Sequence, residues 1–280
     1  MIKRELVEKL KELDLIQHWD NIKSVSRPSI RLQLPSEEEE DIAVGSSKMG
    51  GAPDLPIDSQ WPTESALEKP LAFIAQINLA EVAGADEQGL LPRQGLLSFF
   101  YSADQEAWGY DYQDRDKFKV LYFEGSPSEL HRAPFPDTLE ADARFEPCAL
   151  IPQLEISLPS WESNLLDFLT ESEQESVYEL EEGNVNKLLG HADTIQDSME
   201  LQCELVTNGI YCGDSSAYTS PQAKALEPNA VNWQLLLQVD SNEEECGMMW
   251  GDSGRLYFWI KEEDLRNKKF DASWVILQCY

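Results

Sequence analysis

Two apolar runs of this sequence each end in polar side chains, and these side chains are the best candidates for binding chemistry. The run LAFIAQI is followed by Asn78 and carries Gln76, while the run VNWQLLLQV carries Gln238 and is followed by Asp240. A few amides and carboxylates that converge on a cleft can orient a small polar ligand. The alternative is that each amide satisfies neighbouring backbone groups. The candidates for such a cleft are Gln76, Asn78, Gln238, Asp240, Trp250 and Asp252.

Each of these runs is preceded by a turn of the same pattern, which indicates an internal duplication. Residues 48–54 read KMGGAPD and residues 187–193 read KLLGHAD, and in both halves a glycine turn and an aromatic strand follow the apolar run. Glycine permits the positive φ that tight turns need. The alternative role of binding a phosphate is disfavoured, because neither turn matches a GxGxxG or P-loop motif. The turn residues that we single out are Gly50, Gly51, Pro53, Asp54, Gly190 and Asp193.

Other chemistry finds little support in the residue pattern. The nearest approach to a zinc set is His191 with Cys203 and Cys212, but these spacings fit no familiar site. The segment DYQDRD lacks the glycine and the terminal glutamate of a calcium loop. No GxSxG motif or Cys/His pattern indicates a nucleophile. We therefore expect no metal and no cofactor, and we favour a protein that is not an enzyme.

The elements that would position these residues are mainly strands. Apolar or alternating segments predict strands at 30–34, 71–77, 96–101, 119–123, 231–239, 255–260 and 273–279, with a further candidate at 108–112. Helical spacing predicts an amphipathic helix within 1–14. Residues 160–182 predict one helix or two short ones, with a capping box at Ser172 and Glu175 and a stop at Gly183. The expected fold is α+β, mainly β, with antiparallel or mixed sheets from two related halves and a few peripheral helices.

The net charge of the chain excludes some classes of binding partner. The chain has 280 residues and a net charge of −30, which is the wrong sign for a nucleic-acid binder or for docking on anionic lipid. Eight acids lie within 160–182 and five within 37–41, so the acidity belongs to loops and a helix face. The first residues resemble no signal peptide and no apolar run is long enough to span a bilayer, which predicts a cytoplasmic protein.

Several longer motifs resemble the YwqG-like bacterial family. They are SKMGGAPDLP at 47–56, PLAFIAQINL at 70–79, LPRQGLLSFFY at 91–101, LLGHADTIQ at 188–196, WGDSGRLYFWI at 250–260 and the ending DLRNKKFDASWVILQCY. The resemblance covers nearly the whole chain. It implies a mainly β fold built from two related halves in a domain of unknown function, and it supplies no catalytic residues.

The sequence therefore leaves two hypotheses of different class. The favoured one is a non-catalytic, acidic interaction module that binds a basic protein, for example as an immunity-type inhibitor. The alternative is a small-molecule binder or an unrecognised enzyme, with its site between the halves. We expect one unit over 1–280, monomeric or weakly oligomeric. Its parts would be a helical segment at 1–27, a β-rich half at 28–159, an acidic helical connection at 160–183 and a second β-rich half at 184–280.

Overall fold

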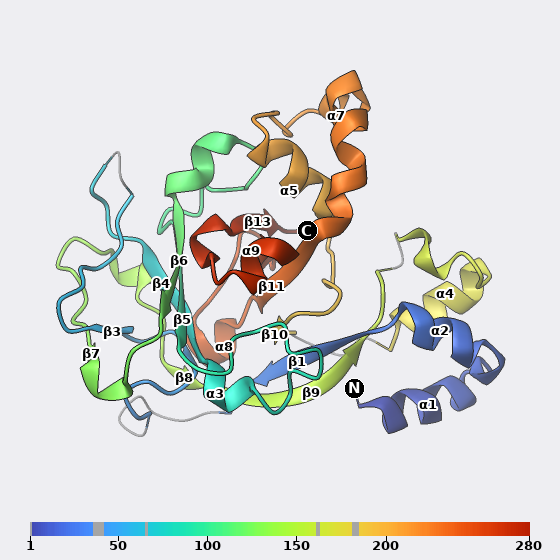
Figure 1. Ribbon diagram of the computed structural model, residues 1–280, viewed down its shortest axis with the longest axis horizontal. Helices are drawn as coiled ribbons and strands as arrows, with labels where there is room; N and C mark the ends of the chain where they lie inside the picture. Colours follow the sequence, from blue (N-terminus) through green and yellow to red (C-terminus); the bar gives the residue numbers. More distant parts are fainter. Residues whose placement is uncertain (1, 36–41, 65–66, 161–162, 181–184) are drawn as a thin grey trace.

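Three antiparallel sheets organise the chain. The structure is a computed structural model that describes residues 2–35, 42–64, 67–160, 163–180 and 185–280. A six-stranded sheet has the order β13-β12-β11-β10-β1-β9, a five-stranded sheet has the order β6-β5-β4-β2-β8, and β3 pairs with β7 (Figure 1). The strands are β1 (Arg27–Gln33), β2 (Lys48–Met49), β3 (Asp54–Pro56), β4 (Ala72–Asn78), β5 (Leu96–Tyr101), β6 (Phe118–Phe123), β7 (Leu130–Arg132), β8 (Cys148–Ala149), β9 (Ile151–Ser157), β10 (Lys187–Leu188), β11 (Trp233–Asp240), β12 (Arg255–Lys261) and β13 (Trp274–Gln278).

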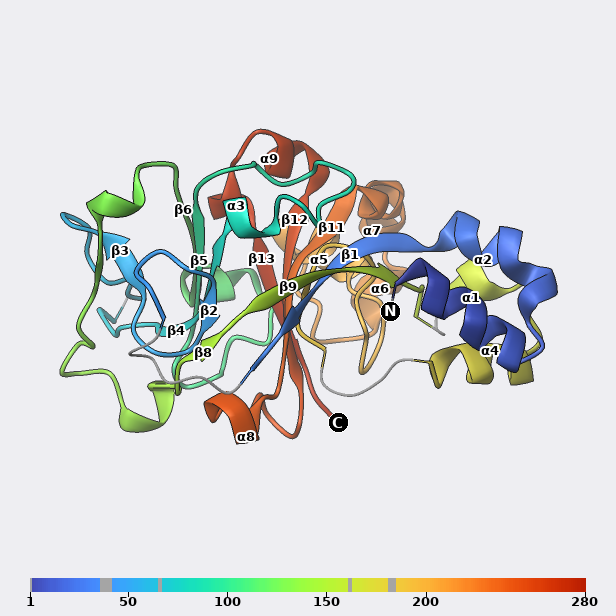
Figure 2. The same cartoon turned by 90° about the horizontal axis from the view of Figure 1, so that it is seen from below.

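Helices lie around these sheets. Near the N-terminus, α1 and α2 pack with α4 at one end of the molecule, away from the five-stranded sheet (Figure 2). A separate apolar cluster holds them there, because Leu6 and Leu10 of α1 are buried together with Ile22 and Val177. The α-helices are α1 (Lys3–Glu12), α2 (Trp19–Val25), α3 (Leu79–Val82), α4 (Glu171–Tyr178), α5 (Glu200–Thr207), α6 (Ser216–Thr219), α7 (Pro221–Leu226), α8 (Glu243–Cys246) and α9 (Glu262–Arg266).

The two larger sheets repeat one another strand by strand, which confirms the two related halves. The order β6-β5-β4-β2-β8 in one sheet matches β13-β12-β11-β10-β1 in the other. Lys48 pairs with Gln76 in the first half, and Lys187 pairs with Gln238 in the second. Both hairpins also carry a register shift directly before the glutamine. It lies between Phe73 and Ala75 in β4–β5 and between Leu235 and Leu237 in β11–β12. A shared bulge at a matching position is a specific feature of the backbone.

The first half contributes strands to both larger sheets. β1 lies at the start of this half but pairs with β10 in the sheet of the second half. β8 lies near the end of the first half and pairs with β2 in the sheet of the same half. The pairing of β1 with β10 ties the two halves together through backbone hydrogen bonds as well as through side chains.

The main core is continuous across both halves. Phe99 of β5 and Phe258 of β12 occupy equivalent positions and contact one another, with ring centroids 5.1 Å apart and planes at 67°. When two halves are related by a twofold axis, residues next to the axis contact their own equivalents. Both rings are fully buried, so this contact lies at the centre of the apolar cluster that joins the halves.

Two predicted elements differ from the structure. Residues 108–112 form turns rather than a strand, because Gly109 adopts φ +81° and its N–H bonds to Asp114 at 3.0 Å. The acidic connection forms α4 only from Glu171, and its capping box uses Thr170 and Glu173 in place of the predicted Ser172 and Glu175. The predicted stop at Gly183 and the acidic run 37–41 lie outside the described residues.

Candidate functional site

The glycine turn of the first half encloses a buried polar cluster. Gln76 accepts a hydrogen bond from the Asp54 N–H at 2.8 Å and donates to the Asp54 carboxylate at 2.7 Å and to the Ser46 carbonyl at 2.7 Å. Lys48 donates to the Ala52 carbonyl of the same turn. Arg132 from β7 pairs with Asp54 at 3.0 Å. Lys48, Asp54 and Gln76 are all at most 1% exposed, so this copy is sealed inside the protein.

The second half builds the same cluster from equivalent residues. Gln238 accepts from the Asp193 N–H at 2.9 Å and donates to the Asp193 carboxylate at 2.7 Å and to the Val185 carbonyl at 2.9 Å. Lys187 donates to Asp193 Oδ1 at 2.6 Å. In both copies, the lysine and the aspartate lie at the two ends of the turn, and the glutamine lies on the strand beside it. This shared arrangement explains why the spacing Lys-x5-Asp recurs in the sequence.

Both aspartates are held in their ionised form. Burial acts to raise the pKa of Asp54, but hydrogen bonds from Arg132, Gly45 and Gln76 and the charge of Lys48 outweigh it and lower that pKa. Burial likewise opposes ionisation of Asp193, and the charge and hydrogen bond of Lys187, with the hydrogen bond of Gln238, lower its pKa. The lysines thus meet a permanent negative partner at neutral pH.

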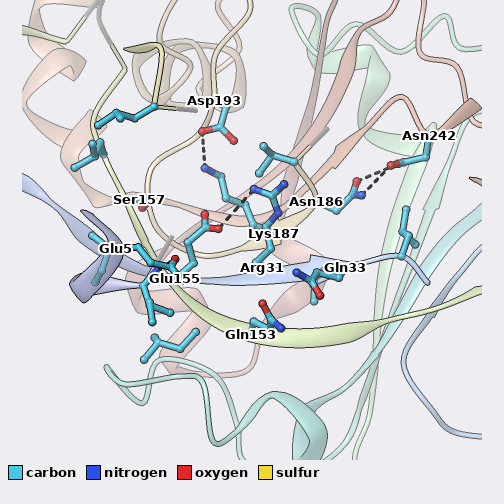
Figure 3. A pocket seen from close by; sticks show the side chains of 18 of the residues that line it. Glu5, Arg31, Gln33, Gln153, Glu155, Ser157, Asn186, Lys187, Asp193 and Asn242 are labelled. Carbon is cyan, nitrogen blue, oxygen red and sulfur yellow. Dashed lines mark hydrogen bonds and ion pairs between the residues drawn. The ribbon is translucent and has the colours of Figure 1, made fainter. Parts of the chain in front are cut away.

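The two copies differ in what surrounds them, because the second one opens onto a cavity. A cavity of about 700 Å³ is lined by Lys187 and Asp193, whereas Lys48 and Asp54 line neither this cavity nor the smaller one of about 240 Å³ beside Trp250. A volume of this size suits a drug-sized or nucleoside-sized molecule. Figure 3 shows the larger cavity, which lies between α1, the β1–β9 pair and the turn that follows β10.

Polar side chains from both halves face the cavity. Arg31 of β1 pairs with Glu155 of β9 at 3.6 Å. Asn186 and Asn242 exchange two amide hydrogen bonds, at 2.9 and 3.0 Å. These pairs are drawn in Figure 3, together with Gln33 and Gln153, which extend from β1 and β9. The remaining polar lining residues that carry charge or a hydroxyl are Glu5, Lys9, Ser157 and Glu245.

The structure distributes the predicted cleft residues over separate places. Gln76 and Gln238 have no exposed surface, and each bonds within its own half, as the alternative role of satisfying backbone groups describes. Asn78 caps α3 by accepting from the Ala80 N–H at 3.0 Å. Asp240 accepts from the Val185 N–H at 2.9 Å and from Arg255 at 2.8 Å. The cleft candidates therefore support the turns and do not face one another across a shared opening.

The two residues predicted for the adjoining turn also separate. Trp250 is buried, donates to the Asp240 carbonyl at 3.1 Å and forms one wall of the smaller cavity. Asp252 is exposed, and its backbone carbonyl accepts from the Tyr280 N–H at 3.2 Å.

The predicted turn glycines have a structural reason. Gly50, Gly51 and Gly190 all have positive φ, of 61°, 65° and 78°. A Cβ on Gly50 would lie 2.1 Å from the Glu146 carbonyl oxygen, and one on Gly190 would lie 2.4 Å from Ser157 Oγ. The Pro53 carbonyl accepts from the Ala133 N–H at 2.9 Å and so fixes the exit of the first turn.

One family model spans both of the repeated turns. A family model described as a domain of unknown function, DUF1963, matches residues 47–279. The chain belongs to this family. The DUF1963 match covers both Lys-x5-Asp turns and leaves Glu5, Arg31 and Gln33 of the cavity outside its range. No curated protein matches the chain.

Sequence reasoning missed most of the residues that line the cavity of this DUF1963 protein. Arg31, Gln33, Gln153 and Glu155 alternate with apolar residues on two strands, so a pattern of period two marks them only as one polar face. Lys187 carried a stronger signal, since a lysine stands at the same point of both turns.

Two kinds of functional feature are absent from the described residues. Within the described residues, no group of three His, Cys, Asp or Glu side chains has the geometry to hold a metal ion. In that same part of the chain, no helix is both long and apolar enough to cross a membrane.

Proposed function

We propose that this chain is a binding protein for a small polar molecule, which it holds in the cavity at the second Lys-x5-Asp turn. The observation that carries the proposal is the difference between the two copies of the turn. The same buried lysine and aspartate are sealed in the first half and line a cavity of about 700 Å³ in the second. Binding is favoured over catalysis because Lys187 with Asp193, and Asn186 with Asn242, are locked in pairs that position groups.

A ligand screen with a blocked cavity tests this proposal. Thermal shifts of the purified protein would be measured with sugars, nucleosides, amino acids, organic acids and polyamines. Gln153 is exposed and lines the cavity, so Gln153→Trp fills the opening at little cost to folding. Val231→Trp is the matched control, since Val231 is 71% exposed and lines neither cavity. We expect a stabilising ligand whose effect disappears only in Gln153→Trp, and a shift that survives in that variant contradicts the proposal.

A second candidate function is the acidic interaction module that binds a basic protein in the manner of an immunity-type inhibitor. It is supported by exposed acids that both halves bring together. Glu243, Glu244 and Glu245 of α8 are all exposed, and the Glu146 N–H bonds to the Cys246 carbonyl at 2.9 Å, which adds a fourth exposed acid. Complementary charge of this kind accelerates association and depends on salt.

Charge-neutral variants separate this candidate from general acidity. Glu243→Gln, Glu244→Gln and Glu245→Gln would be combined in one protein, and the exposed Glu171→Gln, Glu175→Gln and Glu179→Gln of α4 and its C-terminal end in its control. Proteins captured by the immobilised wild type at low salt should be basic and should be lost only with the α8 variant. Equal capture by both variants contradicts the module.

We also propose that the chain is YwqG-like within its family and acts in the cytoplasm. The motifs SKMGGAPDLP and WGDSGRLYFWI support this subgroup, and both lie within the matched range 47–279.

A further inference from the structure

One lysine that lines the cavity has more hydrogen-bond donors than acceptors. Lys187 is 1% exposed, and its ammonium has three N–H groups but a single acceptor, Asp193 Oδ1, among the residues that the structure describes. The other carboxylate oxygen of Asp193 is occupied by Gln238. An unmatched buried donor is costly, so this position favours a ligand that places an oxygen acceptor against Lys187.

The charges around the cavity disfavour an ionic ligand. Of the three cations that line it, Arg31 faces Glu155 at 3.6 Å and Lys187 faces Asp193 at 2.6 Å, and Lys9 is the third. An anion would compete with these carboxylates and would approach a chain of net charge −30. A cation would have to displace Arg31 from Glu155 or Lys187 from Asp193, and the displaced side chain would lose its carboxylate partner. An uncharged molecule avoids both costs.

The mouth of the cavity offers groups that both donate and accept. Gln33 and Gln153 are exposed and lie on the neighbouring strands β1 and β9, and their side chains form no hydrogen bond with any described residue. A carboxamide supplies two donors and one carbonyl acceptor, which matches hydroxyl groups that also do both. Figure 3 shows the two side chains close together on the same ribbon pair.

We infer that the ligand is an uncharged polyhydroxylated molecule of disaccharide or nucleoside size. One of its oxygens accepts from the Lys187 ammonium, and its outer hydroxyls bond to Gln33 and Gln153. This inference rests on the proposed binding function and specifies the class of molecule. It also assigns different roles to two equivalent lysines. Lys48 only stabilises its turn, whereas Lys187 also binds the ligand.

Calorimetric titration with probes of three charge classes tests the inference. The uncharged arm contains trehalose, sucrose, adenosine and uridine, the anionic arm contains citrate and inorganic phosphate, and the cationic arm contains spermidine. We expect heat of binding from the uncharged arm alone, absent in Gln153→Trp. If citrate, phosphate or spermidine binds instead and Gln153→Trp abolishes that binding, the proposed function holds and the inference is wrong. If no probe of any arm binds, both are contradicted.

The two lysines provide the matched pair of variants. Lys187→Gln should weaken binding of the uncharged probe at least tenfold, which is the loss expected for one hydrogen bond to a charged group. Lys48→Gln removes a lysine from the same environment in the sealed copy and should leave affinity within twofold. Equal losses in both variants would assign Lys187 a structural role only and overturn the inference.

A second variant covers the case in which Lys187→Gln does not fold. Gln33→Ala and Gln153→Ala, combined, change exposed side chains that have no partner in the described chain, so the fold is kept. We expect at least tenfold weaker binding of the uncharged probe. Unchanged affinity in this double variant contradicts the placement of the ligand.

Discussion

At the scale of single residues, two glutamines organise the two turns. Gln76 and Gln238 each make three hydrogen bonds, to the N–H and the carboxylate of one aspartate and to one carbonyl oxygen. The bonds are buried except the one from Gln76 to the Ser46 carbonyl, which is partly buried, and each glutamine fixes an aspartate whose pKa is lowered. The glutamines therefore hold a charge in the core that would otherwise be unfavourable.

Replacing either glutamine should destabilise the protein by a similar amount. Gln76→Leu and Gln238→Leu each remove three side-chain hydrogen bonds and leave a carboxylate less well paired, so we expect a loss of about 3 kcal/mol or more in the free energy of unfolding. Denaturant unfolding measures it. Gln33→Leu, at an exposed position, is the control and should change stability by less than about 0.5 kcal/mol. A large difference between the two core variants would contradict the equivalence of the turns.

His191 should make stability depend on pH between about 6.5 and 4. Burial and the charge of Arg27 lower the pKa of His191 to about 4, and its ring Nε2 bonds to the Val25 carbonyl at 2.8 Å. Because the folded protein favours the neutral ring, this stabilisation is full above the unfolded pKa of 6.5 and is lost as the pH falls through 4. The loss is on the order of 3 kcal/mol.

The variant His191→Asn should flatten that part of the pH profile. Unfolding would be followed by denaturant titration at a series of pH values. Asp54 and Asp193 do not interfere, because their lowered pKa values place their own loss of stability below the ordinary value of 3.8. An identical slope in the variant and the wild type between pH 6.5 and 4 would show that another group titrates there.

At the scale of elements, the glycine turns position the clusters by bringing backbones close together. Gly190 has φ +78°, and an added Cβ would lie 2.4 Å from Ser157 Oγ and 2.7 Å from the Cβ of Ser29. The turn after β10 therefore packs directly on β1 and β9, the two strands that carry the other wall of the cavity.

Gly190→Ala should be far more damaging than Gly209→Ala. Gly209 has φ +81° but open space around it, so alanine there costs only the strain of a left-handed backbone, about 1 kcal/mol. At Gly190 the steric overlap is added, and we expect a total of about 3 kcal/mol or more. Thermal unfolding of the two variants compares them, and equal shifts in Tm would contradict the close packing of this turn.

The sequence predicts regular elements well and their long-range partners poorly. The strands at 96–101 and 255–260 are confirmed, because consecutive apolar and aromatic residues leave little choice. The aromatic segment 108–112 is not a strand, since Gly109 has a positive φ and its backbone lies directly against that of Val275, a contact that no local pattern contains. The pairing of β1 with β10 joins residues more than 150 positions apart and is equally invisible to periodicity.

The same limit applies to the candidate site. The repeat of the turns is visible in the order of residues and marks the glutamines and the aspartates as equivalent pairs, but a repeat does not indicate where their side chains face. The sequence does not predict Lys48 and Lys187 as site residues, because a lysine beside a turn is normally exposed to solvent. Only the structure shows that both side chains are buried.

At the scale of the whole molecule, the duplicated halves carry the same polar cluster in two different surroundings. The halves share strand order, a bulge and a self-contact through Phe99 and Phe258, so they are bound into one core. Arg132 pairs with Asp54 in the first copy, and the second copy faces a cavity that residues of β1 also line. In the function that we propose, the first copy contributes stability and the second copy binds the ligand.

The most direct test of this account is a crystal structure of the protein soaked with the uncharged polyol that binds most tightly in calorimetry. We predict density for the ligand in the cavity between β1, β9 and the turn after β10, with one oxygen within hydrogen-bond distance of Lys187 Nζ and no density at Lys48. Ligand density beside Trp250 in the smaller cavity, or density that leaves Lys187 without a contact, would contradict the central claim that the second copy of the turn is the binding site.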